Sequence, residues 1–294
     1  MPADLYGYNF TVDGVAMRDP SNPVIKPNLI WVSNQLLIPG EKPMDWEVQD
    51  VPHGALQQRF YKSALIGDQR DFFVYTPPGY DPAGSKKYPV LYLLHGFSDT
   101  ACGWTAVGQA HTIFDNLIAQ GRCKPMVVVM PLGYGVPYFG RDGKLQFGLA
   151  LDNFGKFRQA LLEEVLPQVE KAYRVSAKRE DRAIAGLSMG GAESLFTGLN
   201  NLDKFAYVGA FSSGGLAATQ VDSVFPNLDV KKANSLKVFW MSCGTDDGLI
   251  GFQRGFSKWL KDKGINHEAA ETPGAHWWML WRRNLADFAG KIFK

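Results

Sequence analysis

Apolar and polar positions follow several different patterns along the chain. From about residue 56 onward, short apolar runs typical of buried strands take turns with longer segments of helical period. This alternation favours a mostly parallel sheet with helices on both faces. Two alternating segments before it, near 58–66 and 70–76, predict an antiparallel start. The expected buried strands are "YPVLYLL", "MVVVM", "DRAIAGL", "YVGAFS" and "LKVFWMSC", and the expected helices lie near 109–121, 154–173, 189–200 and 251–263.

Two of the helical segments carry a clear apolar face. In the segment 154–173 the residues that share one face are Phe154, Phe157, Leu161, Val165 and Val169, as an amphipathic helix requires. Pro167 lies inside this segment, and a proline in a helix interior costs about 3 kcal/mol, so we expect a kink or break there. Near the C-terminus Trp278, Trp281, Leu285 and Phe288 recur at spacings of three and four, which predicts that they face the core.

The first fifty residues follow a third pattern. Tyr6, Tyr8, Phe10 and Val12 alternate with other residues and lead into Asp13-Gly14, a strong hairpin signal. Segments rich in proline and turn residues follow, so we expect β-structure with long loops. We therefore divide the chain into a partial β-rich domain at 1–55 and an α/β domain at 56–294.

Composition narrows the range of partners and cofactors. The chain has 294 residues, 46% of them hydrophobic and 20% charged, with a formal net charge of +2. This charge gives no electrostatic reason to expect nucleic acid or an anionic membrane as a partner, and no run of about 18 apolar residues predicts a membrane span. The three cysteines are too scattered for a disulfide framework, and no Cys/His spacing indicates a metal site.

Ser188 stands between two glycines in "AIAGLSMGGAES", where the strand "DRAIAGL" gives way to a helix. A tight strand-to-helix turn needs small residues beside the serine, and Gly186 and Gly190 meet that need. The N-terminus of the following helix favours developing negative charge. The context therefore predicts that Ser188 is a nucleophile.

A serine nucleophile of this kind needs a histidine base and an acid, which follow it in the order acid, then histidine. His267 lies in a segment with strand character, so we interpret it as structural. His276 lies in a loop before the last helix and is the predicted base. Asp246 and Asp247 both follow the strand "VFWMSC", and spacing alone does not choose between them.

Backbone N–H groups must stabilise the oxyanion that forms during attack on an ester. We expect one donor from Met189, the residue after the nucleophile. The second is expected from Phe97, in the loop "HGFSD" after the strand "VLYLL". We interpret His95 in the same loop as a structural hydrogen-bonding residue rather than a catalyst.

Several motifs together resemble one family of α/β hydrolases. They are "RDFFVYTPPGYD", "KKYPVLYLLHGFSD", "FRQALLEEVLPQVEKAYRV", "RAIAGLSMGG", "CGTDDGLI" and "GAHWWMLWRRNLADF". The chain is similar over 56–294 to the esterase D type of α/β hydrolase, and above all to the feruloyl and acetylxylan esterases of carbohydrate esterase family 1. In that family the triad acid is the fourth residue of "GTxD", which corresponds to Asp247. Residues 1–50 resemble the last part of the immunoglobulin-like early-set domains that precede some of these esterases.

The resemblance implies a serine esterase that hydrolyses feruloyl or acetyl esters of plant cell-wall polysaccharide without a metal or organic cofactor. It also implies a secreted or periplasmic enzyme, and a native chain that is longer than this one. Aromatic walls would suit a phenolic acyl group, and we expect Trp104, Tyr134, Tyr138 and Trp277 to contribute to substrate binding. The loop "PLGYGVPYFGRDGKLQFG" would form a wall or lid, although a surface loop without a binding role fits its composition as well.

Three alternatives fit parts of the same pattern. A catecholate siderophore esterase would need a cluster of cations, and the loops offer only Arg141, Lys144, Arg282 and Arg283. An acyltransferase of the mycolyltransferase type would pass the acyl group to a sugar instead of water. A non-catalytic binding protein that kept the fold is disfavoured by the complete set of serine, acid and histidine.

Overall fold

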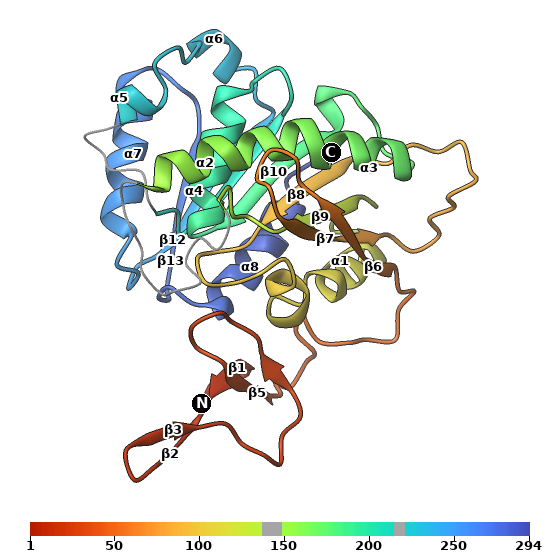
Figure 1. Cartoon of the computed structure of the whole chain (residues 1–294), viewed down its shortest axis with the longest axis vertical. Coiled ribbons are helices and arrows are strands. Elements are labelled where there is room, and N and C mark those ends of the chain that lie inside the picture. Colours follow the sequence, from red (N-terminus) through yellow and green to blue (C-terminus); the bar gives the residue numbers. More distant parts are fainter. Residues whose placement is uncertain (137–148, 215–220) are drawn as a thin grey trace.

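A mostly parallel sheet forms the centre of the molecule (Figure 1). The computed structural model describes residues 1–136, 149–214 and 221–294. Within them the central sheet has eight strands in the order β13-β12-β11-β10-β8-β9-β7-β6. The strands are β6 (Ala55–Lys62), β7 (Gln69–Thr76), β8 (Val90–Leu94), β9 (Val127–Pro131), β10 (Arg182–Leu187), β11 (Tyr207–Phe211), β12 (Val238–Gly244) and β13 (Glu268–Thr272). The pairs β6–β7 and β7–β9 are antiparallel, which confirms the expected antiparallel start.

Helices cover both faces of this sheet. They are α1 (Ala110–Ala119), α2 (Leu149–Ala160), α3 (Leu166–Ala172), α4 (Met189–Asn200), the short α5 (Val221–Val224) and α6 (Val230–Ala233), α7 (Ile250–Asp262) and α8 (Trp278–Ala289). Successive side chains of a strand point to opposite faces, so β8 contributes to two cores. Tyr92 belongs to one core together with residues of α2, α4 and α7, and Leu93 belongs to the other together with residues of α1 and α8. The expected α/β-hydrolase architecture is confirmed.

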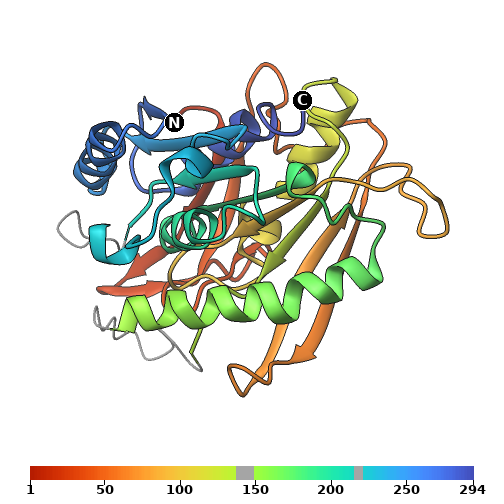
Figure 2. The same cartoon turned by 90° about the horizontal axis from the view of Figure 1, so that it is seen from above.

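The helical segment around Pro167 is continuous but not regular. A π-helical turn (Leu161–Val165) joins α2 to α3, and Figure 2 shows the two as one long helix. Pro167 lies in the first turn of α3, where its missing N–H group is tolerated. The predicted interruption is thus a change of helical period just before the proline. The apolar face predicted for this segment is buried.

The N-terminal segment forms small sheets of its own, below the central sheet in Figure 1. Strands β1 (Asp4–Tyr8), β5 (Ser33–Ile38) and β4 (Ile25–Lys26) pair antiparallel in the order β1-β5-β4. Strands β2 (Phe10–Val12) and β3 (Val15–Met17) form a separate hairpin. Asp13 and Gly14 between them both have positive φ, which confirms the predicted turn.

A buried ion pair joins this segment to the last helix. Asp4 accepts hydrogen bonds from Arg282 Nη1 at 3.1 Å and Arg283 Nη2 at 2.6 Å. Arg282 also donates to the backbone oxygens of Val107 and Leu5. Burial lowers the pKa of Arg282 to about 10, although Asp4 acts in the opposite direction. The N-terminal segment is therefore fixed against α8, and the domain division at residue 55 stays a prediction. In the described part of the chain, no helix combines the length and the hydropathy that crossing a membrane requires.

Candidate active site

Ser188 lies at a sharp turn between β10 and α4. Its φ and ψ are +51° and −116°, a conformation that non-glycine residues rarely adopt. The close packing around the turn explains the glycines on either side. A Cβ atom on Gly186 would lie 2.5 Å from the Gly190 oxygen, and one on Gly190 would lie 2.4 Å from the His95 oxygen. This is the geometry of a nucleophile elbow, which presents the serine hydroxyl above the sheet.

His276 joins Ser188 to Asp247. The His276 Nε2 atom lies 3.0 Å from Ser188 Oγ, and Nδ1 lies 2.9 Å from Asp247 Oδ2. A carboxylate can only accept, so the imidazole carries its hydrogen on Nδ1 and offers the Nε2 lone pair to the serine hydroxyl. The ring also stands edge-on against Trp281, with centroids 4.8 Å apart. The loop between β13 and α8 thus holds the imidazole in the orientation that a general base needs.

Asp247 is buried at 2% exposure, whereas its neighbour Asp246 is exposed. Burial by itself raises the pKa of Asp247. Hydrogen bonds from His276 and from the Leu249 N–H group outweigh burial and hold this pKa below its ordinary value. The Leu249 N–H group donates to Oδ1 at 2.8 Å. Asp247 therefore both orients the imidazole and satisfies an N–H group at the beginning of α7, whereas Asp246 makes no hydrogen bond to His276 within the described residues.

The loop after β8 passes directly beside the nucleophile. A Cβ atom on Gly96 would lie 3.3 Å from Ser188 Cβ. His95 is buried, with Nδ1 2.8 Å from the Gly96 oxygen and Nε2 accepting from the Gly133 N–H group at 2.9 Å. Burial lowers the pKa of His95 to about 4, so the ring is neutral at pH 7 and donates through Nδ1. Since a peptide unit is planar, this bond also fixes the direction of the Phe97 N–H group. These contacts confirm the structural interpretation of His95.

The N-terminal segment holds the other end of the same loop. Asn28 Nδ2 donates to Ser98 Oγ and to Asp99 Oδ1, both at 2.9 Å, and the Leu29 N–H group donates to the Ser98 oxygen at 2.8 Å. Ser98 has a φ of +67°. Burial raises the pKa of Asp99 to about 7, although Asn28 and Lys26 act in the opposite direction. The loop that carries Phe97 is therefore fixed on one side by His95 and on the other by Asn28 and Leu29.

The family model named Esterase matches residues 63–292, which include Ser188, Asp247 and His276. The chain belongs to the Esterase family. Membership confirms the expected class of enzyme, a serine carboxylic-ester hydrolase.

Similar proteins point to the same part of the family. An endo-1,4-beta-xylanase/feruloyl esterase of Xylanibacter ruminicola is 32% identical over 301 residues, which take in 100% of this esterase and 39% of that protein. The esterase thus spans about two fifths of that relative's length. An acetyl esterase of Caldicellulosiruptor saccharolyticus is 25% identical over 240 residues, 69% of this chain and 82% of that protein. A solved CE1 ferulic acid esterase from Anaeromyces mucronatus superposes with a TM-score of 0.71 at 25% identity, covering 86% of this chain and 96% of that one. The resemblance to carbohydrate esterase family 1 is confirmed.

Three buried polar residues near the esterase's site were not predicted from the sequence. Arg70 donates to the backbone oxygens of Leu132 and Tyr134. Asn153 accepts from the Gly135 N–H group at 2.7 Å and donates to Glu193 at 3.1 Å. Burial raises the pKa of Glu193 well above its ordinary value, although the hydrogen bond from Asn153 and the charge of Arg70 act in the opposite direction. Together they fix residues 132–135 beside His95. The sequence feature that could have identified them is a charged or amide residue within an otherwise apolar strand or helix.

The predicted substrate-binding aromatic residues differ in how far the structure buries them. Trp104 is 0% exposed and donates to the Leu94 oxygen at 2.9 Å, so its expected role in the pocket wall is wrong. Tyr134 is also placed in the core, with its hydroxyl on the Asp99 oxygen at 2.8 Å, and it supports the loop from behind instead of lining the pocket. Tyr138 lies outside the described residues. Trp277 is 46% exposed beside His276, and its role in binding stays a prediction.

Three further residues have the structural roles that the sequence predicts. They are Trp278, Trp281 and His267. Trp278 and Trp281 are buried on the core face of α8. His267 bonds to Ser257 Oγ at 2.7 Å and to the Ile265 oxygen at 2.9 Å. Their structural interpretation is confirmed.

Proposed function

We propose that this esterase hydrolyses hydroxycinnamoyl esters, above all feruloyl esters, of plant cell-wall polysaccharide. The observation that carries the proposal is the hydrogen-bonded series Ser188–His276–Asp247. It occurs in a chain that is 32% identical, along its whole length, to part of a xylanase/feruloyl esterase. Because such a polysaccharide is met outside the cytoplasm, the proposal includes a secreted or periplasmic enzyme.

The geometry supports a two-step acyl transfer. The Ser188 hydroxyl attacks the ester carbonyl while His276 Nε2 takes its proton, and Asp247 stabilises the imidazolium that results. The N–H groups of Phe97 and Met189 are the proposed donors to the oxyanion. Collapse of this intermediate breaks the ester bond, and His276 gives the proton to the leaving alcohol. Water then attacks the acyl-Ser188 ester with His276 again as base, which releases the acid and restores the hydroxyl.

Removal of acetyl groups is the second candidate activity, favoured by the similarity to the acetyl esterase of Caldicellulosiruptor saccharolyticus. A siderophore esterase is less well supported. Arg282 and Arg283, two of the four cations considered for it, both bind Asp4. Arg141 and Lys144 lie outside the described residues. An acyltransferase would be recognised by a new ester formed on an added sugar acceptor.

The test is hydrolysis of methyl ferulate and of an aryl acetate by the parent protein and by Ser188→Ala. We expect the parent to cleave methyl ferulate and the variant to lose at least about 1,000-fold in kcat. Ser194→Ala is the matched control, because this buried serine lies on α4 with its hydroxyl on the Gly190 oxygen and away from His276. Cleavage of the acetate alone would replace the feruloyl proposal by the acetyl one. Full activity in Ser188→Ala would overturn both.

A further inference from the structure

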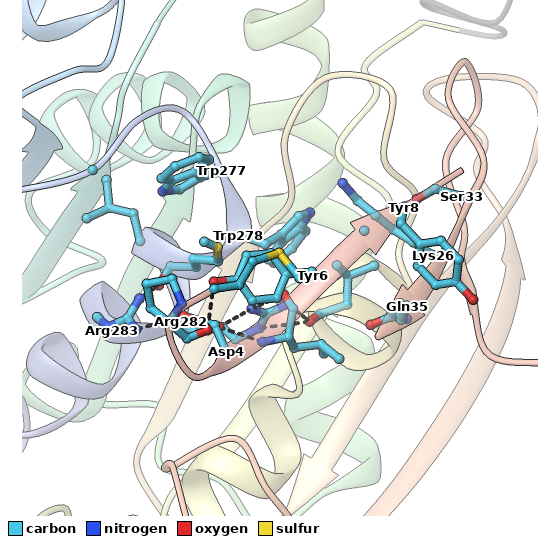
Figure 3. Close-up of a pocket in the computed structure, with 18 of the residues that line it drawn as sticks. Asp4, Tyr6, Tyr8, Lys26, Ser33, Gln35, Trp277, Trp278, Arg282 and Arg283 are labelled. Carbon is cyan, nitrogen blue, oxygen red and sulfur yellow. Dashed lines mark hydrogen bonds and ion pairs between the residues drawn. The ribbon is translucent and has the colours of Figure 1, made fainter. Parts of the chain in front are cut away.

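A cavity of about 760 Å³ lies between the N-terminal segment and the beginning of α8. One wall comes from β1, Lys26, Ser33 and Gln35, and the other from Pro273–Gly274 and the first turns of α8. Figure 3 shows Trp277 at one side of this cavity and Tyr8, Lys26 and Ser33 at the other. Residues 1–55 therefore build half of a cavity whose other half belongs to the α/β domain.

The cavity adjoins the loop that carries the candidate base. Gly274 and Trp277 line it, and His276 lies between them in the chain. In the reaction proposed above, His276 Nε2 gives its proton to the oxygen of the leaving alcohol. The alcohol half of the ester must therefore lie on the His276 side of Ser188. A cavity that adjoins the loop of His276 is thus placed to receive this half of the substrate.

The lining suits a sugar. Trp277, with 46% of its surface exposed, and the rings of Tyr6 and Tyr8 offer apolar faces. Binding sites for small molecules combine such faces with a few well-placed polar groups. Lys26 offers an ammonium group, and within the described residues no carboxylate lies at ion-pair distance from it.

Gln35 is a buried polar residue in the wall of this cavity. Its side chain is 94% buried and lines the cavity. The Nε2 atom donates to the backbone oxygens of Ile25 and Ala106, whereas Oε1 has no hydrogen-bond partner in the described part of the chain. Buried acceptors of this kind normally have a partner. Because Oε1 has less than 1 Å² of accessible surface, a ligand in the cavity does not reach it, and Gln35 contributes to the wall of the cavity rather than to recognition of a sugar.

We propose that this cavity is a subsite for the sugar chain that carries the acyl group. This inference rests on the proposed function, since it takes the alcohol half of the ester to be a polysaccharide. The aromatic rings stack on the sugar faces, while Lys26 donates to a sugar hydroxyl. The N-terminal segment thereby takes part in choosing the polysaccharide, and the acyl group is bound elsewhere.

The first experiment compares methyl ferulate with a feruloylated xylo-oligosaccharide in the parent, Tyr6→Ala and Trp31→Ala. Trp31 is the matched control, because it is an aromatic of the same segment with 72% exposure and no part in the cavity lining. We expect Tyr6→Ala to lower the ratio of kcat/KM for the oligosaccharide ester to that for methyl ferulate about tenfold, mainly through KM, with Trp31→Ala keeping the parental ratio. An unchanged ratio in Tyr6→Ala would overturn the inference.

A second experiment separates this inference from the proposed function. Ser188→Ala protein is titrated with a xylo-oligosaccharide that carries no ester, and binding is followed by tryptophan fluorescence. Saturable binding that is lost in Tyr6→Ala/Ser188→Ala supports the subsite, and absence of binding at millimolar concentrations overturns it. If the parent protein cleaves only aryl acetate but Ser188→Ala binds the oligosaccharide, the feruloyl proposal fails and the subsite stands.

Discussion

The backbone of Ser188 is held in a left-handed conformation, with φ at +51°, that costs about 1–3 kcal/mol for a residue with a side chain. Several contacts around Ser188 hold its backbone in this conformation. The Ser188 N–H group donates to the Phe211 oxygen at 2.8 Å. The chain packs so closely around the turn that a Cβ atom at position 186 or 190 would clash with backbone, so both positions are glycine. The strain therefore serves to hold Oγ in reach of His276 Nε2.

At the same scale, Asp247→Asn tests the orientation of the imidazole. An amide in place of the carboxylate can donate to Nδ1 and so favours the tautomer that has a hydrogen on Nε2. We expect kcat for methyl ferulate to fall about 100- to 10,000-fold with little change in stability. Steady-state kinetics check the result, with Asp246→Asn as the matched control because that neighbour is exposed. Equal losses in the two variants would contradict the assignment of Asp247.

Residue identity alone did not settle every role in the site. Asp246 and Asp247 are adjacent and chemically identical, so spacing could not separate them, whereas family resemblance and then burial did. Trp104 was misjudged because the number of aromatics near a loop does not show which of them face the core. Ser188 and His276 could be predicted because a glycine-flanked strand end and a loop before the last helix limit the choice of residue.

Among the elements, the loop after β8 is fixed from two directions. His95 binds the Gly96 oxygen on one side, and Asn28 and Leu29 of the N-terminal segment bind Ser98 and Asp99 on the other. The strands and helices were predictable because their hydrophobic periods are local. The contact between Asn28 and this loop joins residues about 70 positions apart, and no local period reports such a contact.

Asn28→Ala tests whether this attachment serves catalysis. Loss of the two side-chain bonds from Asn28 to Ser98 and Asp99 should let the Phe97 N–H group shift from the oxyanion, which forms only in the transition state. We expect kcat for methyl ferulate to fall about tenfold with KM nearly unchanged. Asn28→Ser, which keeps a donor, should recover part of the loss. Asn22→Ala is the control, because within the described part of the chain the Asn22 side chain bonds only to residues of the N-terminal segment. A change in KM alone would speak against a positioning role.

For the molecule as a whole, the N-terminal segment and the α/β domain share buried charged groups. The bond from Arg282 to Asp4 joins β1 to α8, and Asp99 accepts a hydrogen bond from Asn28 of the N-terminal segment. A buried carboxyl group with a raised pKa binds its proton more tightly in the folded than in the unfolded protein. The pH dependence of unfolding therefore reports on this contact region.

Asp99 predicts a loss of stability with rising pH. Its pKa is about 7 in the folded protein, against an ordinary value of 3.8. The group's favourable contribution is thus fully present below about pH 4, decreases as the pH rises and is lost above about pH 7. Asp99→Asn should remove this decrease and be more stable than the parent at pH 8, on the order of a few kcal/mol. Denaturant unfolding at pH 5 and pH 8 checks this, with Asp246→Asn as the exposed control. The same pH dependence in parent and Asp99→Asn would refute the prediction.

The central claim, that Ser188 carries the acyl group of a feruloyl ester, is tested most directly by trapping the intermediate. The protein is mixed with excess methyl ferulate, quenched in acid during turnover, and analysed by intact mass and by peptide mapping. The account predicts a mass increase of one feruloyl group, located on Ser188 and absent from Ser188→Ala. Turnover of methyl ferulate by a protein whose only acylated residue is another one, or an adduct that persists in Ser188→Ala, would contradict it.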